Sequence, residues 1–403
     1  MKYLMQFRFK AELFALLVMQ LALSGCSATK ESTQPQAKQE QESRAAQDLR
    51  TEQNQKTEKV DLTQLKAKAD EYYKKANYLA AEPLYKEVLL RPLAYNSILD
   101  ITDLVAIANK LAKIYEMREQ YDATEFCHRF ALEALKKSPK ASERDKAIAM
   151  YKLGCSRQQH GDYQGVELLF RESYQILKKE VAKDPTDAEA LNIMAYLTFL
   201  STDSSGAHDM WNRAVKASLT REGKGKLHAA EALNWLTGTS PQGSTASEIK
   251  QTENLHKQAV QIVESVLGKN DPEVANQLDG LGRFYEDECK DFEKGWQCYA
   301  GSLKIREKAL YEFAPEIGRS LDGLASCKFR QGKTDEAIPL ERRSNAIKTK
   351  FLVPGGMWFS GSDRNLAFYL EQSGNKKEAQ FLSDRASLAT HHSWAYGPKY
   401  KLE

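Results

Sequence analysis

Cysteine and histidine are the residue types in this chain that could bind a metal ion or form disulfides. Five cysteines follow Cys26, an odd number with no spacing typical of a zinc knuckle: Cys127, Cys155, Cys289, Cys298 and Cys327. We expect most of them to be small packing residues, and Cys298 and Cys327 to be the pair closest to forming a bridge. His391 and His392 are adjacent but have no third ligand beside them. We therefore predict no metal site and no cofactor.

The sequence carries none of the common catalytic motifs. It lacks a Gly-x-Ser-x-Gly nucleophile elbow and a His-Glu-x-x-His zinc helix, and Gly223-Lys224-Gly225-Lys226 has neither the spacing nor the preceding strand of a phosphate-binding loop. Lysine and arginine number 58 against 55 acidic residues, with no dense basic stripe, so nucleic acid is not an expected partner. We predict that the protein is not an enzyme, and no small-molecule substrate is evident.

The amino terminus combines a basic start with an apolar run from Leu13 to Leu23. Such a run is too short to span a bilayer, which needs roughly 20 apolar residues. The segment resembles the signal peptide of bacterial lipoproteins, because Leu23, Ser24, Gly25 and Cys26 match the lipobox. The resemblance implies that residues 1–25 are removed and that Cys26 is lipidated, which anchors the protein to a membrane of the bacterial cell envelope. A signal peptide cut at an ordinary small-residue site is the alternative.

Residues 26–60 contain the modified cysteine and then a polar stretch rich in glutamine and charges, which has too few apolar residues to form a core. We expect a flexible tether here. The resemblance further implies that Ser27, standing where an aspartate would retain the protein at the inner membrane, permits sorting to the outer membrane, with the protein facing the periplasm.

One small residue recurs every 41 to 45 positions through the rest of the chain. In register, the eight residues are Val88, Ala131, Ser173, Ala214, Ala259, Ser302, Ser344 and Ala386. Small side chains allow two helices to approach closely, and a period of this length is typical of stacked helical hairpins. We therefore predict an all-α protein, an α-solenoid of about eight stacked hairpins.

The repeat resembles the tetratricopeptide repeat of the 42-residue kinesin-light-chain type. Its first-helix pattern is matched by Leu281-Gly282, Leu324-Ala325 and Leu366-Ala367. The segments 270–275 and 303–310 also match the sequence typical of this repeat closely. The resemblance covers roughly residues 62–390 and implies a right-handed superhelix. We divide it into N-terminal repeats (61–222) and C-terminal repeats (223–390), followed by an aromatic tail (391–403). We expect this tail to cap the last helix, and docking to a partner is the alternative.

In this repeat type the first helix of each hairpin faces a concave groove, which implies where a partner would bind. The candidate groove residues are Asn109, Lys113, Tyr151, Asn192, Tyr196, Asn276, Arg283, Arg319, Arg330, Arg364, Asn365 and Phe368. Arginine and asparagine suit the backbone and carboxylates of an extended peptide, and the aromatic rings offer stiff apolar contact. The alternative is that these are solvated helix faces with occasional ion pairs to Asp279 or Asp322.

Two functional hypotheses follow from these features. The first is a membrane-anchored scaffold that binds a peptide or helix of an envelope protein in the groove. The alternative is an envelope hydrolase, or the obligate cofactor of a cell-wall or secretion enzyme. Three local expectations accompany them: an irregular fourth hairpin in which Thr202 replaces the turn glycine, a long loop at residues 238–244, and prolines 83 and 339 in the first turn of second helices.

Overall fold

The structure is a computed structural model that describes residues 61–94, 100–163, 165–239, 245–351 and 357–387. These residues form sixteen α-helices and one short 3₁₀ helix, with no strand among them. The predicted lipobox, tether and aromatic tail lie outside the described residues. Within the described part, no helix combines the length and the low charge needed to cross a bilayer.

The helices pair in sequence order into eight antiparallel hairpins, which we number one to eight, as predicted. The first helices are α3 (Leu62–Lys74), α5 (Ile101–Met117), α7 (Glu143–His160), α9 (Ala188–Leu200), α11 (Leu227–Gly238), α13 (Pro272–Asp287), α15 (Pro315–Arg330) and α17 (Met357–Gln372). The second helices are α4 (Tyr78–Ala94), α6 (Tyr121–Lys137), α8 (Val166–Lys183), α10 (Ser204–Leu219), α12 (Ala246–Leu267), α14 (Phe292–Ala309), α16 (Thr334–Phe351) and α18 (Lys376–Ser387). The 3₁₀ helix η1 (Gly223–Lys226) joins hairpins four and five.

The recurring small residues lie where their helices pack most closely. All eight fall on second helices, and none is more than 6% exposed. The serines also use their hydroxyls: Ser173 donates to the main-chain oxygen of Ala147 at 2.8 Å, and Ser344 to that of Gly318 at 3.0 Å. A hydroxyl can reach the backbone of the neighbouring helix only if the two helices nearly touch. The predicted α-solenoid is therefore confirmed.

The turn inside most hairpins contains one residue in the left-handed backbone region. These residues recur with the same period and are Ala76, Glu119, Gly161, Thr202, Lys290, Gly332 and Gly374. Glycine adopts positive φ freely, whereas a residue with a Cβ pays a steric cost that is greatest for a β-branched side chain. Thr202, at φ 78°, thus occupies the position that Gly161 occupies at φ 79° one hairpin earlier.

We expect Thr202→Gly to raise the free energy of unfolding by about 1 kcal/mol, because it removes the strain of a β-branched residue at positive φ. Chemical denaturation of the two proteins would measure the change. The reverse substitution, Gly161→Thr, is the matched control and should lower stability by a similar amount, since a Cβ at Gly161 would meet no atom within 4 Å and only the backbone conformation is affected. Equal stability of all three proteins would contradict the assignment of strain.

Both prolines lie one turn further into their helices than the sequence predicts. Pro339 lies inside α16, and Pro83 is likewise the sixth residue of α4. The reason is the compact turn: Ala76 and Gly332 take up the left-handed conformation, and each second helix begins only two residues later. Both prolines therefore remove a hydrogen bond from a helix interior, on exposed faces.

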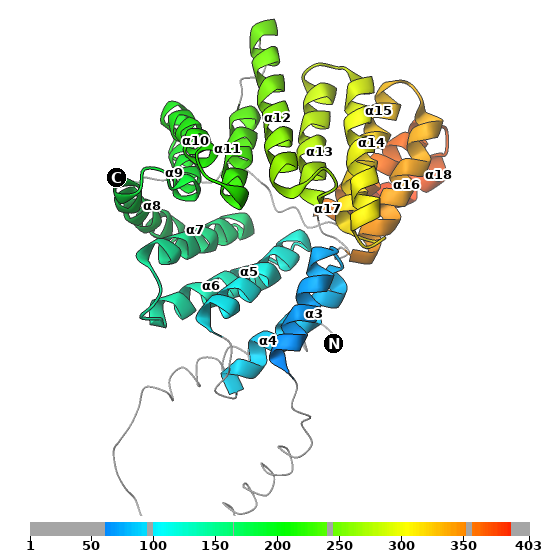
Figure 1. The fold of residues 1–403 in the computed structure, drawn as a ribbon. Helices are drawn as coiled ribbons and strands as arrows, with labels where there is room; N and C mark the ends of the chain where they lie inside the picture. Colours follow the sequence, from blue (N-terminus) through cyan, green and yellow to red (C-terminus); the bar gives the residue numbers. More distant parts are fainter. Residues whose placement is uncertain (1–60, 95–99, 164, 240–244, 352–356, 388–403) are drawn as a thin grey trace, which may run out of the picture.

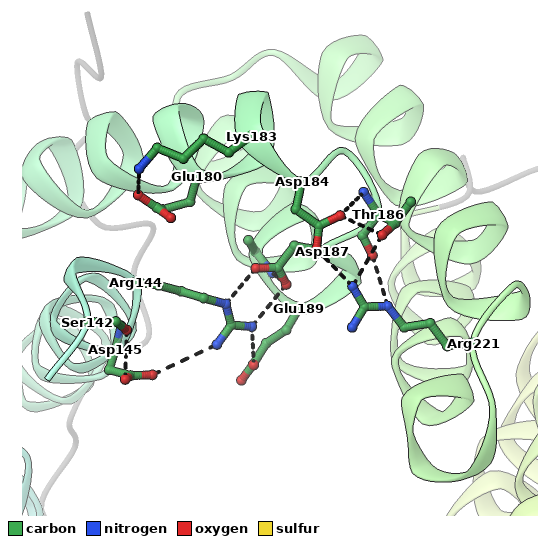
Figure 2. A network of polar contacts seen from close by, with 11 residues as sticks. Ser142, Arg144, Asp145, Glu180, Lys183, Asp184, Thr186, Asp187, Glu189 and Arg221 are labelled. Atoms are coloured by element: carbon green, nitrogen blue, oxygen red, sulfur yellow. Dashed lines mark hydrogen bonds and ion pairs between the residues drawn. The ribbon is translucent and has the colours of Figure 1, made fainter. Parts of the chain in front are cut away.

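Neighbouring hairpins are also joined at their ends by charged side chains. Figure 2 shows such a network between hairpins three and four, centred on Arg144 and Asp187 and joined by Arg221, which follows α10. Arg144 donates from Nε to Asp187 Oδ2 at 2.5 Å and from Nη2 to Asp187 Oδ1 at 2.9 Å, and Nη2 also reaches Glu189. Burial alone would raise the pKa of Asp187, but these bonds hold it below its usual value. A bidentate pair of this kind fixes the angle between adjacent hairpins.

The apolar core continues across the predicted division between N-terminal and C-terminal repeats at residues 222–223, since Trp211 and Leu233 belong to one buried cluster.

The solenoid curves so strongly that its first hairpin reaches the sixth and seventh (Figure 1). Tyr78 of hairpin one donates to Glu316 Oε1 of hairpin seven at 2.6 Å, across 238 residues of sequence. The main-chain nitrogen of Tyr311 donates to the oxygen of Lys75 at 2.7 Å, and the rings of Tyr78 and Phe351 lie 5.8 Å apart. A single turn of the superhelix is thereby closed into a ring.

Candidate functional site

A cavity of about 770 Å³ lies among the first helices of hairpins five to eight and is here called the groove cavity. It is lined chiefly by the first helices α11, α13, α15 and α17, with smaller contributions from α12 and α14. The structure brings five of the predicted groove residues together there: Asn276, Arg283, Arg319, Arg330 and Asn365. Successive first helices thus present equivalent positions to one concave surface, as the repeat pattern predicts.

Two guanidinium groups in this cavity have no carboxylate partner among the described residues. Arg283 and Arg319 are both exposed, and Arg319 donates from Nη2 to the side-chain oxygen of Asn276 at 3.0 Å. Exposed guanidinium groups keep their donors available for an incoming acceptor. Arg283 and Arg319 are therefore the groove residues best placed to bind a partner.

Arg330 is different, because it is already paired within the protein. Its Nε lies 2.9 Å from Glu286 Oε1 and its Nη2 lies 3.3 Å from Asp287 Oδ1. Glu286 is only 5% exposed and also accepts from Tyr299 and Ser326. The ion-pair alternative thus holds for Arg330, with Glu286 and Asp287 as partners rather than the two aspartates that the sequence suggested.

Those two aspartates form ion pairs with buried basic side chains of the second helices. Asp279 pairs with Arg306, and Asp322 pairs with Lys348. The two pairs are equivalent, since Arg306 and Lys348 each follow a register serine by four residues. Arg306 is fully buried and also donates to the Ser320 hydroxyl at 2.6 Å.

The charge of the cavity lining is more balanced than a run of arginines suggests. Three arginines face five carboxylates, which gives a formal charge of 3 − 5 = −2 for the lining residues. Most of these carboxylates are neutralised by Arg306, Lys348 and Arg330. The exposed carboxylate of Glu288 also lines the cavity, so the lining offers acceptors as well as the donors of Arg283 and Arg319.

The candidates on hairpins two to four lie outside this cavity. Asn109 is half-buried on α5, and Lys113 is exposed and lies 3.3 Å from Glu116. Asn192 is only 2% exposed, and its amide donates to the main-chain oxygen of His228 at 3.0 Å. The position of Asn192 in the repeat predicted a groove contact, but the neighbouring α11 covers it, so its amide joins two hairpins instead.

Tyr151 and Tyr196 belong to an aromatic row that crosses successive first helices. Their ring centroids are 5.9 Å apart, Tyr196 lies 4.9 Å from Trp235, and Trp235 stacks on the buried Trp211 at 5.8 Å. Burial raises the pKa of Tyr151 well above its usual value. These rings mainly pack hairpins against one another, which is a role that a single repeat does not reveal.

The remaining candidates, Arg364 and Phe368, are exposed on α17 beside the cavity but do not line it. The ring of Phe368 lies 5.1 Å from Phe329. Three further residues line the cavity without having been expected there: Glu286, His256 and Tyr299. His256 and Tyr299 come from second helices, which the repeat pattern assigns to the outer layer, so the pattern contained no signal for them.

Among the described residues, no three His, Cys, Asp or Glu side chains are arranged to hold a metal ion. The five described cysteines are free thiols. Cys127 and Cys327 are 2% and 0% exposed, which confirms packing as their role, and burial raises the pKa of each to about 12.

His256 in the cavity wall should make stability depend on pH. Burial and the nearby Arg283 lower its pKa to about 4, whereas an unfolded histidine titrates near 6.5. Between these values only the unfolded chain binds the proton, so stability falls as the pH decreases from about 6.5 to 4, by about 1 kcal/mol per pH unit. We expect His256→Gln to flatten this part of the pH profile in chemical denaturation. His128, whose pKa is lowered to about 4 by burial, contributes with the same sign and remains as an internal comparison. An unchanged slope would show that His256 is charged in the folded protein.

No protein-family profile and no curated protein matches the sequence. Solved structures do match. A kinesin-light-chain protein from Podosopora anserina, built of nearly identical TPR-like repeats, is 19% identical over 61% of this chain and 95% of its own, with a TM-score of 0.31. BtubC (BKLC) from P. vanneervenii is 15% identical over 75% of this chain and 96% of its own, with a TM-score of 0.33. These two solved structures to which the chain is similar are thus kinesin-light-chain-like proteins, and the first is described as having TPR-like repeats.

Proposed function

We propose that the protein is an envelope-anchored scaffold whose groove cavity binds a peptide or helix of a partner protein. The fold supports the general role, since helical repeats of this type are interaction scaffolds. The observation that carries the proposal is the pair Arg283 and Arg319, two exposed guanidinium groups on adjacent first helices without a carboxylate partner in the described structure. A partner would satisfy them with side-chain or main-chain oxygens.

The anchor in this proposal is the lipid on Cys26, which the lipobox resemblance supports. Several acyl chains, at about 0.8 kcal/mol per buried CH₂ group, hold a protein on a membrane stably. Growth with a labelled fatty acid tests this directly: the wild-type chain should carry the label and sediment with membranes, and Cys26→Ala should do neither. A labelled Cys26→Ala protein would exclude this anchor.

We expect reversal of the two free cavity charges to abolish partner capture. A photo-crosslinker placed at Asn234, on the cavity wall, would be activated in the native envelope and its adducts identified by mass spectrometry. In the variant Arg283→Glu/Arg319→Glu, adducts should fall about tenfold or more, because carboxylates replace the donors and repel the partner's acceptors.

The matched control is Arg171→Glu/Arg213→Glu, which reverses two exposed charges on second helices. It should retain the adducts, and both variants should keep wild-type helicity by circular dichroism. Undiminished crosslinking of the Arg283→Glu/Arg319→Glu variant would exclude the groove cavity as the binding site.

A further inference from the structure

The contact that closes the ring is of a different kind from the contacts that build the solenoid. Tyr78 is 8% exposed, and its hydroxyl donates to Glu316 Oε1 at 2.6 Å. It shares one apolar cluster with Ala314, Ile317 and Phe351, which lie in or beside hairpin seven. Burial and the carboxylate of Glu316 raise the pKa of Tyr78, so the phenol keeps its proton and remains a donor. Hairpin one thus docks by a small set of specific side chains.

Hairpin one packs on hairpin two as well as on hairpin seven. In a solenoid each repeat is stabilised by its sequence neighbours, and hairpins one and seven are separated by five others. The two ends also leave a cavity of about 550 Å³ between them, lined by Tyr73 and Tyr78 on one side and by Glu273 and Leu310 on the other. An interface with such a hollow has fewer contacts than a stack of hairpins.

The same contact is connected to the groove cavity through a buried side chain. Arg306, which is fully buried, donates from Nη1 to the main-chain oxygen of Glu316 at 2.8 Å and from Nη2 to the side-chain oxygen of Asn276 at 2.8 Å. Asn276 in turn accepts from Arg319 and lines both cavities. The docking site of Tyr78 and the candidate binding site thus share one hydrogen-bonded network.

We propose that hairpin one is a clasp: its docking through Tyr78 on Glu316 closes the solenoid into a ring, and its release opens the ring and admits bulky molecules to the groove cavity. Closure of the ring does not depend on the proposed function. Control of access to the groove cavity rests on the proposed function, because it regulates binding at that site.

Solution scattering tests the closure without any partner. Tyr78→Asp places a second carboxylate opposite Glu316 and removes the ring that packs on Phe351, so we expect a larger radius of gyration with unchanged helicity. Leu79→Asp is the matched control, because Leu79 is the adjacent residue of α4 but is 44% exposed. It should scatter as the wild type does. Identical curves for Tyr78→Asp and the wild type would overturn the clasp, and lost helicity would show local unfolding in its place.

A reversible crosslink distinguishes opening of the ring from unfolding of the variant. The main chains of Lys75 and Tyr311 are in hydrogen-bond contact, within the span of a disulfide, so Lys75→Cys/Tyr311→Cys should lock the clasp when oxidised. Combined with Tyr78→Asp, the oxidised protein should regain the compact curve and the reduced protein should lose it. Failure of oxidation to restore compactness would overturn the proposal.

Access to the groove is measured with maleimides of two sizes on the Asn234→Cys variant, with labelled sites assigned by mass spectrometry. N-ethylmaleimide should react at equal rates in locked and unlocked protein. A poly(ethylene glycol) maleimide should react several-fold faster once the lock is reduced or Tyr78 is replaced by Asp. Equal rates for the bulky reagent would overturn the control of access while leaving ring closure intact. Absence of any crosslinked partner in the envelope experiment would instead count against the proposed function alone.

Discussion

Asp279→Ala should lower the free energy of unfolding by about 3–5 kcal/mol, one of the two largest effects we expect in this protein. Asp279 Oδ2 accepts from Nη1 of Arg306 at 2.6 Å, and the Arg306 side chain is completely buried. Removing the carboxylate leaves a buried charge without its counter-ion, which is far more costly than losing the hydrogen bond alone. Chemical denaturation followed by circular dichroism would measure the loss.

An exposed ion pair serves as the control for this variant. Glu307 lies 2.7 Å from Arg343, and both side chains are more than 40% exposed. Glu307→Ala should therefore change stability by less than about 1 kcal/mol. The double variant Asp279→Ala/Arg306→Met should be more stable than Asp279→Ala, because it removes the unpaired charge. Equal losses from the buried and the exposed pair would show that Arg306 is hydrated.

Gly323→Ala should destabilise the protein by about 1–3 kcal/mol, although alanine is the better helix former. A Cβ at residue 323 would lie 2.5 Å from two ring carbons of Tyr299, which is 6% exposed and hydrogen-bonded to Glu286. The ring cannot move away without breaking that bond, so the helices must separate. Thermal and chemical denaturation would report the change.

The preceding hairpin supplies a control at the same position of the repeat. Gly280 lies 43 residues before Gly323, and the atoms nearest to its added Cβ are those of His256 at 3.8 Å. Gly280→Ala should therefore stabilise α13 by about 0.5–1 kcal/mol through helix propensity. Opposite signs at equivalent positions would show that packing and not backbone preference decides the effect. A loss of stability in both variants would contradict this.

The sequence was sufficient to predict the hairpins because their determinants are local. Small residues at 41 to 45-residue spacing are needed wherever two helices touch, and all eight register positions are buried. Only some of the turn positions could be recognised from glycine in the sequence, because four turns have another residue at positive φ: Ala76, Glu119, Thr202 and Lys290. Tertiary packing overrides local preference at these four sites.

The candidate site was predicted less completely, for a physical reason. Repeat register tells which helix face is concave, and it brought Asn276, Arg283 and Arg319 to one cavity. It does not tell which charges neutralise one another, since Arg330 and Asp279 find partners on different helices. Closure of the ring was not predictable from a repeat either. It depends on small rotations summed over many hairpins, which no single repeat encodes.

Ring closure also determines the order in which the protein assembles. Contacts within and between neighbouring hairpins join residues close in sequence, whereas the Tyr78–Glu316 contact closes a loop of 238 residues. Loop-closure entropy makes such distant contacts slow to form. Contacts between residues close in sequence form faster. We therefore expect the docking of the first hairpin on Glu316 to form later than the stacking of neighbouring hairpins.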